Sequence, residues 1–416
     1  MQQYMNKRIK GLLAAMLAMA VSVQAADEDR IKALEQQMEA ANAEIAALKG
    51  EKNDLSAVTA PASKLTLGGY GEIHANFSDG GNSTFDIHRL VLYAGYEFAD
   101  WIRLVSETEL EHAFVSSGSG GEISIEQLYV DFLLSDPVNI RAGRILAPLG
   151  IINQHHEPTL FFGVERPSFA HDIIPTTWSL DGIGVFGSPL SWLTYEAYVV
   201  AGLNGSGFDG SEGIREGRNK ERQGLDDPAI TGRIDVFPIV EKTQNLRIGL
   251  SGYHGGTDNA NKGGAGSPSV DNTFTMVSAD FDYEVSRFIF RGVVAQGSHS
   301  DAADINAAYT TDAGEEILGW YLESGVSVMP QSWKTGKLKE SDIVPFVRYE
   351  WYDTQHKVPA GTAKDDANER TDVTVGVNWL LNQQFVVKAD IHFLSDEANG
   401  SDVDNKYNLG IGWVFQ

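Results

Sequence analysis

Cysteine is absent from the chain, and so is any apolar run long enough to cross a membrane as a helix. The absence of cysteine excludes disulfides, thiolate metal sites and a lipid anchor attached to an N-terminal cysteine. Basic residues are few, since 32 Lys and Arg stand against 57 Asp and Glu and give a formal net charge of -25. Nucleic acid is therefore not an expected partner, because a phosphate backbone requires a basic surface.

The N-terminus has the features of a secretory signal peptide. Lys7, Arg8 and Lys10 precede an apolar run over residues 11–23, and small residues lead up to Ala25. This pattern predicts a signal peptide over residues 1–25, cleaved after Ala25. Its apolar run is shorter than the roughly 20 residues of a spanning helix. Cleavage removes three positive charges, so the net charge moves from -25 to -28.

A heptad pattern follows the signal. Apolar residues recur at intervals of three and four, at Ile31, Leu34, Met38, Ala41, Ile45, Leu48 and Leu55. This spacing predicts a short coiled-coil helix within residues 26–55, on the periplasmic side of the membrane. An isolated helix of this length is marginal in water, which favours association between copies of the chain over the alternative, a helix lying on its own barrel. Residues 56–63 are then a linker.

Residues 64–416 show the two-residue period of β-strands. In the last segment Tyr407, Leu409, Ile411, Trp413 and Phe415 share one face, while polar residues and glycines share the other. Sixteen such strands are expected to start near residues 64, 84, 101, 122, 138, 181, 191, 229, 244, 272, 287, 315, 341, 370, 383 and 404. Two irregularities, at Pro345 and around residues 124–128, are interpreted as errors in strand boundaries.

The connections between these strands alternate between short and long, as in outer-membrane barrels with tight periplasmic turns and longer outer loops. The chain is therefore predicted to be all-β, a sixteen-stranded antiparallel transmembrane β-barrel preceded by the coiled-coil helix. One connection stands out: residues 148–180 contain four prolines, many apolar residues and closely spaced charged and imidazole groups. These features indicate an ordered loop that packs inside the barrel.

The order of signal, heptad segment, linker and sixteen strands resembles the trimeric outer-membrane porins of Gram-negative bacteria, in particular the family of phosphate-selective porins O and P. The first strand (LTLGGYGEIHANF), the last strand (YNLGIGWVF) and the run GRILAPLG are similar to theirs. The resemblance implies a homotrimer in which the loop after the fifth strand folds inward and narrows the pore. In one departure, Phe415 is followed by Gln416, whereas these porins usually end on an aromatic residue.

Two groups of polar residues are candidates for the pore. The expected constriction, on and next to the inward loop, comprises Arg141, Arg144, His155, His156, Glu157, Glu165, Arg166, His171 and Asp172. The expected lumen-facing residues on the strands are Glu72, Arg89, Arg103, Glu107, Glu109, Arg233, Arg247 and Arg348. Fourteen acids on comparable strand faces outnumber seven arginines, so phosphate selectivity is not carried over, and a weak preference for cations is expected instead.

Other chemistry is disfavoured. A metal site on His155, His156, Glu157, His171 and Asp172 is not expected, because adjacent histidines on an extended backbone point apart. Phe161, Phe162, Phe169 and Trp178 are interpreted as anchors of the loop rather than a stacking surface for sugars. Ser168 and His171 lack the third group of a catalytic triad, so the chain is not expected to be an enzyme, and no cofactor is expected.

The sequence therefore predicts a porin of the outer membrane, in contact with its lipid, through which small hydrophilic solutes and ions diffuse passively. Two alternatives remain: a phosphate- or anion-selective porin, and a structural or adhesive outer-membrane barrel.

Overall fold

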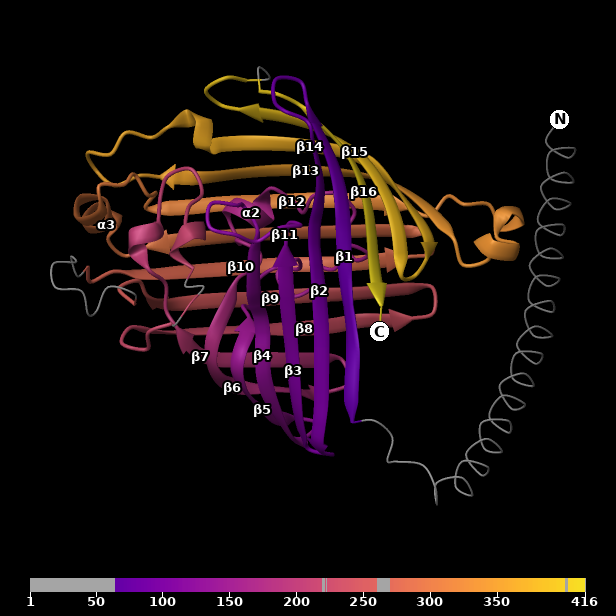
Figure 1. Cartoon of the computed structure of the whole chain (residues 1–416). Helices are drawn as coiled ribbons and strands as arrows, with labels where there is room; N and C mark the ends of the chain where they lie inside the picture. The colour runs from indigo at the N-terminus through magenta and orange to yellow at the C-terminus, as the bar shows by residue number, and fades with distance from the viewer. Residues whose placement is uncertain (1–63, 219–220, 222, 260–269, 401–402, 416) are drawn as a thin grey trace, which may run out of the picture. The chain divides into compact units, whose positions relative to one another are not determined.

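The computed structural model describes residues 64–218, 221, 223–259, 270–400 and 403–415, and the predicted signal, coiled coil and linker lie outside these residues. The described residues form sixteen antiparallel strands (Figure 1). The first eight are β1 (Leu65–Ser78), β2 (Thr84–Ala99), β3 (Ile102–Glu111), β4 (Glu122–Ser135), β5 (Val138–Leu146), β6 (Ser179–Leu190), β7 (Leu193–Ala201) and β8 (Pro228–Glu241). The others are β9 (Gln244–Gly256), β10 (Thr273–Val285), β11 (Phe288–His299), β12 (Glu316–Val326), β13 (Asp342–Lys357), β14 (Glu369–Asn382), β15 (Phe385–Asp396) and β16 (Lys406–Phe415).

Each strand pairs with its neighbours in sequence, and β1 pairs with β16 to close the barrel. The closing pair runs from Gly69 opposite Phe415 to Ser78 opposite Lys406. Closure leaves no open sheet edge, which a structure that crosses lipid requires. The predicted sixteen-stranded antiparallel barrel is thus confirmed, and every predicted strand start lies within two residues of the observed one.

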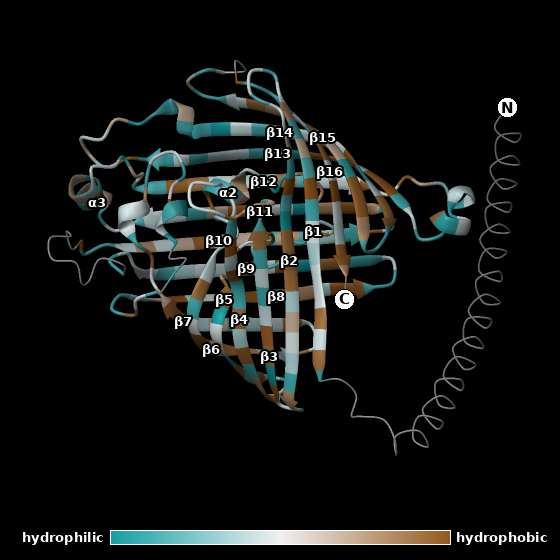
Figure 2. Ribbon diagram, viewed as in Figure 1, coloured by the Kyte–Doolittle hydropathy of each residue, from teal (hydrophilic) through white to brown (hydrophobic). Residues whose placement is uncertain are grey.

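Outward positions along the strands are apolar and exposed, and inward positions are buried. Leu250, Val277 and Leu322 are exposed on the outside, whereas Ser251, Ser278 and Glu323 beside them are buried. Figure 2 shows hydrophobic and hydrophilic residues alternating along the strands. This alternation with period two is the pattern of a barrel with an apolar outer face.

The two ends of the barrel differ in the length of their connections. At one end six turns contain two residues each, and only the connection over residues 327–341, with the 3-10 turns η3 (Gln331–Trp333) and η4 (Gly336–Leu338), is longer. The other end carries the remaining long loops, which hold α2 (Phe169–Asp172), η1 (Gly205–Gly207), η2 (Arg215–Gly217), α3 (Ala302–Tyr309) and η5 (Asp366–Asn368). No helix among the described residues is long and apolar enough to cross a membrane.

β4 and β2 each contain a β-bulge, and the bulge in β4 corrects the interpretation of residues 124–128. The register between β3 and β4 shifts where Gln127 lies opposite Glu107 and Ile125 lies opposite Thr108, so Glu126 is the extra residue. The phase slip predicted around residues 124–128 is therefore a real bulge and not a boundary error. A second bulge, between β1 and β2, makes His88 the extra residue there.

Pro345 lies inside β13, opposite Val377 of β14. The pairing of β13 with β12 stops at the next residue, Phe346, so no partner there requires the N–H that proline lacks. The barrel therefore accommodates a proline close to the start of a long strand, and Pro345 does not mark an error in the strand boundaries.

The loop between β5 and β6 lies inside the barrel and forms a hydrophobic core with one side of the wall. Leu149, Ile173 and Trp178 from the loop are fully buried in one cluster with Tyr253 and other inward residues, including Tyr198, Phe274, Met276 and Tyr321. The short helix α2 packs against β12 and β13. Part of the inward face is therefore apolar, because it contacts protein rather than water.

Candidate pore constriction

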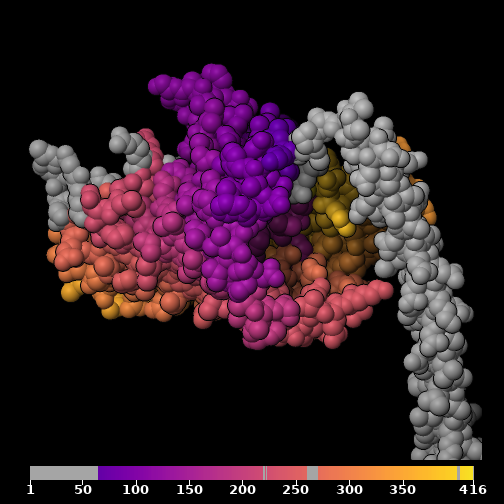
Figure 3. Space-filling view, turned by 90° about the horizontal axis from the view of Figure 1, so that it is seen from below, coloured from indigo at the N-terminus to yellow at the C-terminus, as the bar shows by residue number. Residues whose placement is uncertain are grey.

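A cavity of about 910 Å³ remains between the inward loop and the wall formed by the first four strands. Most of its lining comes from β1 to β4, from loop residues 161–179 and from the neighbouring outer loop around Arg215 and Arg218, and single residues of β5, β13, β14 and β16 complete it. The space-filling view from below shows a hollow between the N-terminal and C-terminal strands (Figure 3). The loop thus fills the side of the barrel on which it packs and leaves a polar space on the opposite side.

The wall of this cavity carries a chain of ion pairs across three adjacent strands. Arg89 of β2 lies between two carboxylates, with its Nε 2.8 Å from Glu72 of β1 and its Nη1 3.0 Å from Glu109 of β3. All three residues are buried. Because each charge has an opposite partner in place, the wall can hold these charges although their side chains are buried.

Two histidines stand next to this chain. His74 of β1 has its Nδ1 2.9 Å from Glu165 of the loop and its Nε2 3.3 Å from Glu72. The His88 ring stacks on that of His74 with 4.4 Å between the ring centroids. The bulge in β2 allows this arrangement, because it adds His88 to the inward side next to Arg89.

A second polar cluster is buried behind the loop. His156 lies with its Nε2 3.5 Å from Glu126 and 3.8 Å from Glu107. Gln127 also hydrogen-bonds to Glu107. The bulge in β4 brings Glu126 to this position, so both irregular strands supply an extra polar residue to the same side of the lumen.

Charged side chains of β8, β13 and β15 form hydrogen bonds to the backbone of the inward loop and hold it in place. The Lys388 ammonium donates to the carbonyls of Phe161 and Gly163, at 2.9 and 2.7 Å. The Phe169 N–H donates to Glu350 at 2.8 Å. Arg233 donates to the Gly150 carbonyl at 2.9 Å. These hydrogen bonds satisfy groups of an irregular backbone inside the barrel, which would otherwise be costly to bury.

The outer loop between β7 and β8 covers the inward loop. Arg218 donates to the carbonyls of Pro175 and Thr177, and Arg215 donates to those of His171 and Thr176. From β14, Arg370 forms an ion pair with Asp172 at 2.8 Å. Basic side chains therefore gather where the inward loop ends, on the same side as the long loops.

The predicted site residues fall into two groups. Those that line the cavity are Glu72, Arg89, Glu109, Arg144, Glu165, Arg166, His171 and Asp172. The others do not line it. Arg103 and Arg141 both pair with Asp131, Arg233 and Arg247 both pair with Asp280, and Arg348 pairs with Glu350. The remaining four, His155, His156, Glu157 and Glu107, lie elsewhere around the loop.

Within the loop, His155 is exposed and His156 is buried, so the adjacent imidazoles point apart as their spacing predicts. Ser168 donates to Asp372, whereas His171 contacts Asp172, so these two residues do not face each other. The four loop aromatics, Phe161, Phe162, Phe169 and Trp178, are all buried. They contact protein, as anchoring residues do.

Several cavity residues lie outside the set proposed from the sequence. They include His74, His88, Glu126, Arg215, Arg218 and Arg370. The phase slip in β4 is the signal that could have indicated Glu126. No sequence pattern indicated Arg215 and Arg218 of the outer loop, because only folding brings them to the lumen.

The charges that line the cavity are nearly balanced. Eight carboxylates line it: Glu72, Glu109, Glu111, Glu122, Glu126, Glu165, Asp172 and Glu212. Seven basic groups line it as well: Arg89, Arg144, Arg166, Arg215, Arg218, Arg370 and Lys406. Arg166 has two buried nitrogens, Nε and Nη2, without a hydrogen-bond partner.

The sixteen-stranded barrel is similar in fold to solved structures of outer-membrane porins and channels. Similar solved structures are an anion-selective porin from Comamonas acidovorans (TM-score 0.53, 14% identity, 85% of this chain and 100% of that one) and the outer-membrane channel DcaP of Acinetobacter baumannii (0.52, 13%, 84% and 97%). Another is OmpF of Salmonella typhi in complex with daunomycin (0.52, 12%, 85% and 98%). At these identities the likeness concerns the fold alone.

In sequence, the chain is 31% identical over 366 residues to an uncharacterized protein of Aquifex aeolicus (strain VF5), covering 84% of this chain and 80% of that protein. The chain belongs to the same family as that protein. No family model matches the sequence.

Proposed function

We propose that the protein is a porin of the outer membrane, through which small hydrophilic solutes and ions diffuse passively. The observation that carries the proposal is the polar cavity between the inward loop and the wall of β1 to β4, inside a closed barrel. Ion pairs line this space, and a water-filled passage needs such polar walls.

The outer face of the barrel supports the proposed location. Large apolar side chains such as Leu92, Ile183 and Leu409 are more than half exposed. Trp101 and Trp192 lie, half exposed, in two of the two-residue turns, where an aromatic belt meets the lipid headgroups. We infer that lipid covers this face, that the short turns face the periplasm, and that the N-terminal segment lies there.

We propose that the pore is general and has only a weak preference for cations, because the lining charges nearly balance. A phosphate- or anion-selective pore is the second candidate. It is favoured by the basic residues at the end of the inward loop and by Arg166, two of whose nitrogens have no hydrogen-bond partner. The resemblance to the phosphate-selective porins O and P stays a prediction, and so does a structural or adhesive role.

Planar-bilayer recording of the purified protein tests the channel. Ser124 of β4 lines the cavity, and Ser124→Trp should lower the single-channel conductance by filling part of it. Thr108 of β3 is exposed on the outer side of the same wall, so Thr108→Trp is the matched control and should conduct as the unmodified protein does. Equal conductance in all three proteins, or no conductance by the unmodified protein, would contradict a pore at this place.

The trimer is proposed from the heptad segment and the porin resemblance. Crosslinking of detergent-purified protein should give three copies, and deletion of residues 26–55 should weaken that association while leaving the barrel folded. A normally conducting monomer would contradict the proposal.

A further inference from the structure

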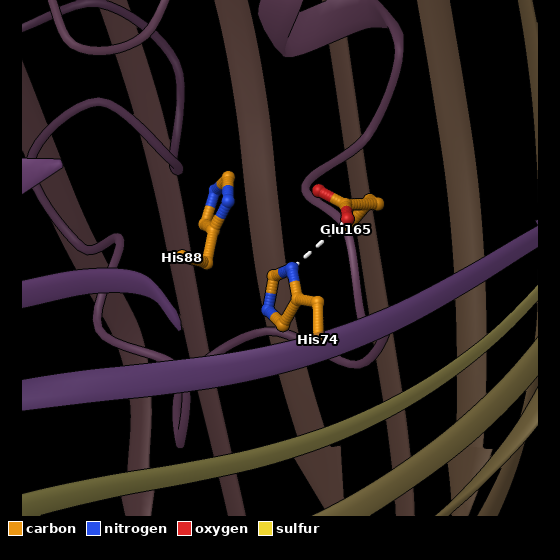
Figure 4. Close-up of side chains that lie close together, drawn as sticks. All are labelled: His74, His88 and Glu165. Atoms are coloured by element: carbon orange, nitrogen blue, oxygen red, sulfur yellow. Dashed lines mark hydrogen bonds and ion pairs between the residues drawn. The ribbon is translucent and has the colours of Figure 1, made fainter. Parts of the chain in front are cut away.

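Three potential metal ligands from three parts of the chain meet at the cavity wall. His74 of β1, His88 of β2 and Glu165 of the inward loop each offer one ligand atom, and these atoms lie within 4.8 Å of one another (Figure 4). All three residues line the cavity. An ion from the water of the pore could therefore reach them, and a water molecule could occupy a fourth position.

The positions of the donors suit a small tetrahedral ion. A zinc ion bound at about 2.0–2.2 Å holds its ligand atoms about 3.3 Å apart. Nδ1 of His74 and Oε1 of Glu165 are already 2.9 Å apart. His88 approaches from the adjacent strand, and its ring stacks on that of His74. Binding requires side-chain rotations that direct these three donors, which lie within 4.8 Å of one another, to one point.

A second shell of carboxylates is in place. Glu72 lies 3.3 Å from Nε2 of His74, so it can hold the proton on that nitrogen and leave Nδ1 for a metal. Asp86 lies 3.3 Å from Nδ1 of His88 and can orient that ring in the same way. Arg89 now contacts Nε2 of His88, but it keeps Glu72 and Glu109 as partners when the ring turns.

The chemistry of the donors determines the class of ion. Two imidazoles and one carboxylate suit zinc and similar divalent transition metals, whereas Mg²⁺ and Ca²⁺ prefer oxygen ligands. Histidine supplies two of the three ligands, which sets this group apart from the acidic surface of the chain. A neighbouring group, Asp86, His88 and His112, shares His88, but Asp86 and His112 do not line the cavity.

We propose that the cavity wall holds a binding site for a divalent transition-metal ion of the zinc class, with His74, His88 and Glu165 as ligands. The bound ion takes the place of the proton shared between His74 and Glu165. It ties the inward loop to β1 and β2 and adds positive charge to the wall. This proposal concerns binding, so it does not depend on whether the barrel conducts.

Titration calorimetry of the full-length mature protein with Zn²⁺ tests the site, and Mg²⁺ serves as the control ion. We expect one Zn²⁺ per chain bound far more tightly than Mg²⁺. His88→Ala and Glu165→Gln should each weaken the binding at least about tenfold, since even the loss of a second-shell partner costs 10–100-fold. Co²⁺ in place of Zn²⁺ should give the visible absorption of a tetrahedral ion.

The control variants separate this site from its neighbours. His356→Ala removes an exposed histidine beside Asp353 and should leave the binding unchanged. His112→Ala should also leave it unchanged, whereas loss of binding in His112→Ala but not in Glu165→Gln would place the ion elsewhere and overturn the proposal. His88→Gln, which can still accept the hydrogen bond from Arg89, should lose binding while folding normally; retention of full affinity would also overturn it.

Discussion

At the scale of single residues, the lumen is organised by buried charges that have partners. Arg348 is completely buried, with its Nε 2.6 Å from Glu350 and its Nη1 3.9 Å from Glu323. Glu350 in turn accepts from the loop N–H of Phe169. One arginine thus stabilises two carboxylates of the wall and, through one of them, the position of the loop.

Replacing this arginine tests that role. Arg348→Met should destabilise the folded barrel by roughly 3–5 kcal/mol, because it leaves buried carboxylates without their counter-charge. The loss is measured as a lower midpoint of heat unfolding in detergent. Lys339→Met, at an exposed pair with Glu340, should change stability by no more than about 0.5 kcal/mol. A stable Arg348→Met barrel would show that the pair contributes little.

The stability of the folded protein should depend on pH through His156 of the inward loop. Burial and the nearby Arg166 oppose protonation, but Glu126 and Glu107 outweigh them and hold the pKa of His156 above its usual value. A group whose pKa is raised on folding stabilises the fold most below its unfolded pKa, about 6.5, and this contribution is lost as the pH rises through the folded value.

Heat-unfolding midpoints across that pH range provide the measurement. The difference in stability between the unmodified protein and His156→Gln should be largest in mild acid and should shrink toward alkaline pH. His171→Gln, at an exposed loop position, is the control. A difference that is constant with pH would mean that folding does not change the pKa of His156.

At the scale of elements, the strands and the inward fold of the loop were predictable, but the contacts that hold the loop were not. Period-two alternation is a local signal, so it located every strand start to within two residues. The contacts that place the loop are distant in sequence, as between Lys388 and Phe161, 227 residues apart. Bulges also escape a strict two-residue period, which is why His88 and Glu126 were not proposed as site residues.

Shortening the loop over residues 153–174 tests what it does in the barrel. The cavity should widen and the single-channel conductance should rise, because the narrowest section sets the conductance. The barrel should stay closed, since no strand pair includes the loop, but its heat stability should fall because inward residues such as Tyr321 lose the apolar cover of Phe169. Shortening the exposed outer segment 116–120 is the control. Unchanged conductance would place the loop outside the conducting path.

At the scale of the whole molecule, the acidic chain would favour strong cation selectivity, whereas the balanced charges of the cavity lining favour weak selectivity. The complete chain has a formal net charge of -25, whereas the cavity lining has eight carboxylates against seven basic groups. Much of the acidity thus lies away from the cavity. Exposed charges act over about 8 Å at physiological salt, so distant acids influence a permeating ion only slightly.

Ion selectivity should therefore be weak, in favour of cations, and should decrease further as salt rises. Reversal potentials in a potassium chloride gradient measure it. Glu111→Gln combined with Glu122→Gln removes two lining carboxylates and should move the potential toward anions, because seven basic groups then face six carboxylates. Glu397→Gln changes an exposed outer-loop residue and should leave the potential unchanged. Strong anion selectivity in the unmodified protein, or block of its conductance by low phosphate, would instead assign the dominant role to the arginines and support the phosphate-selective alternative.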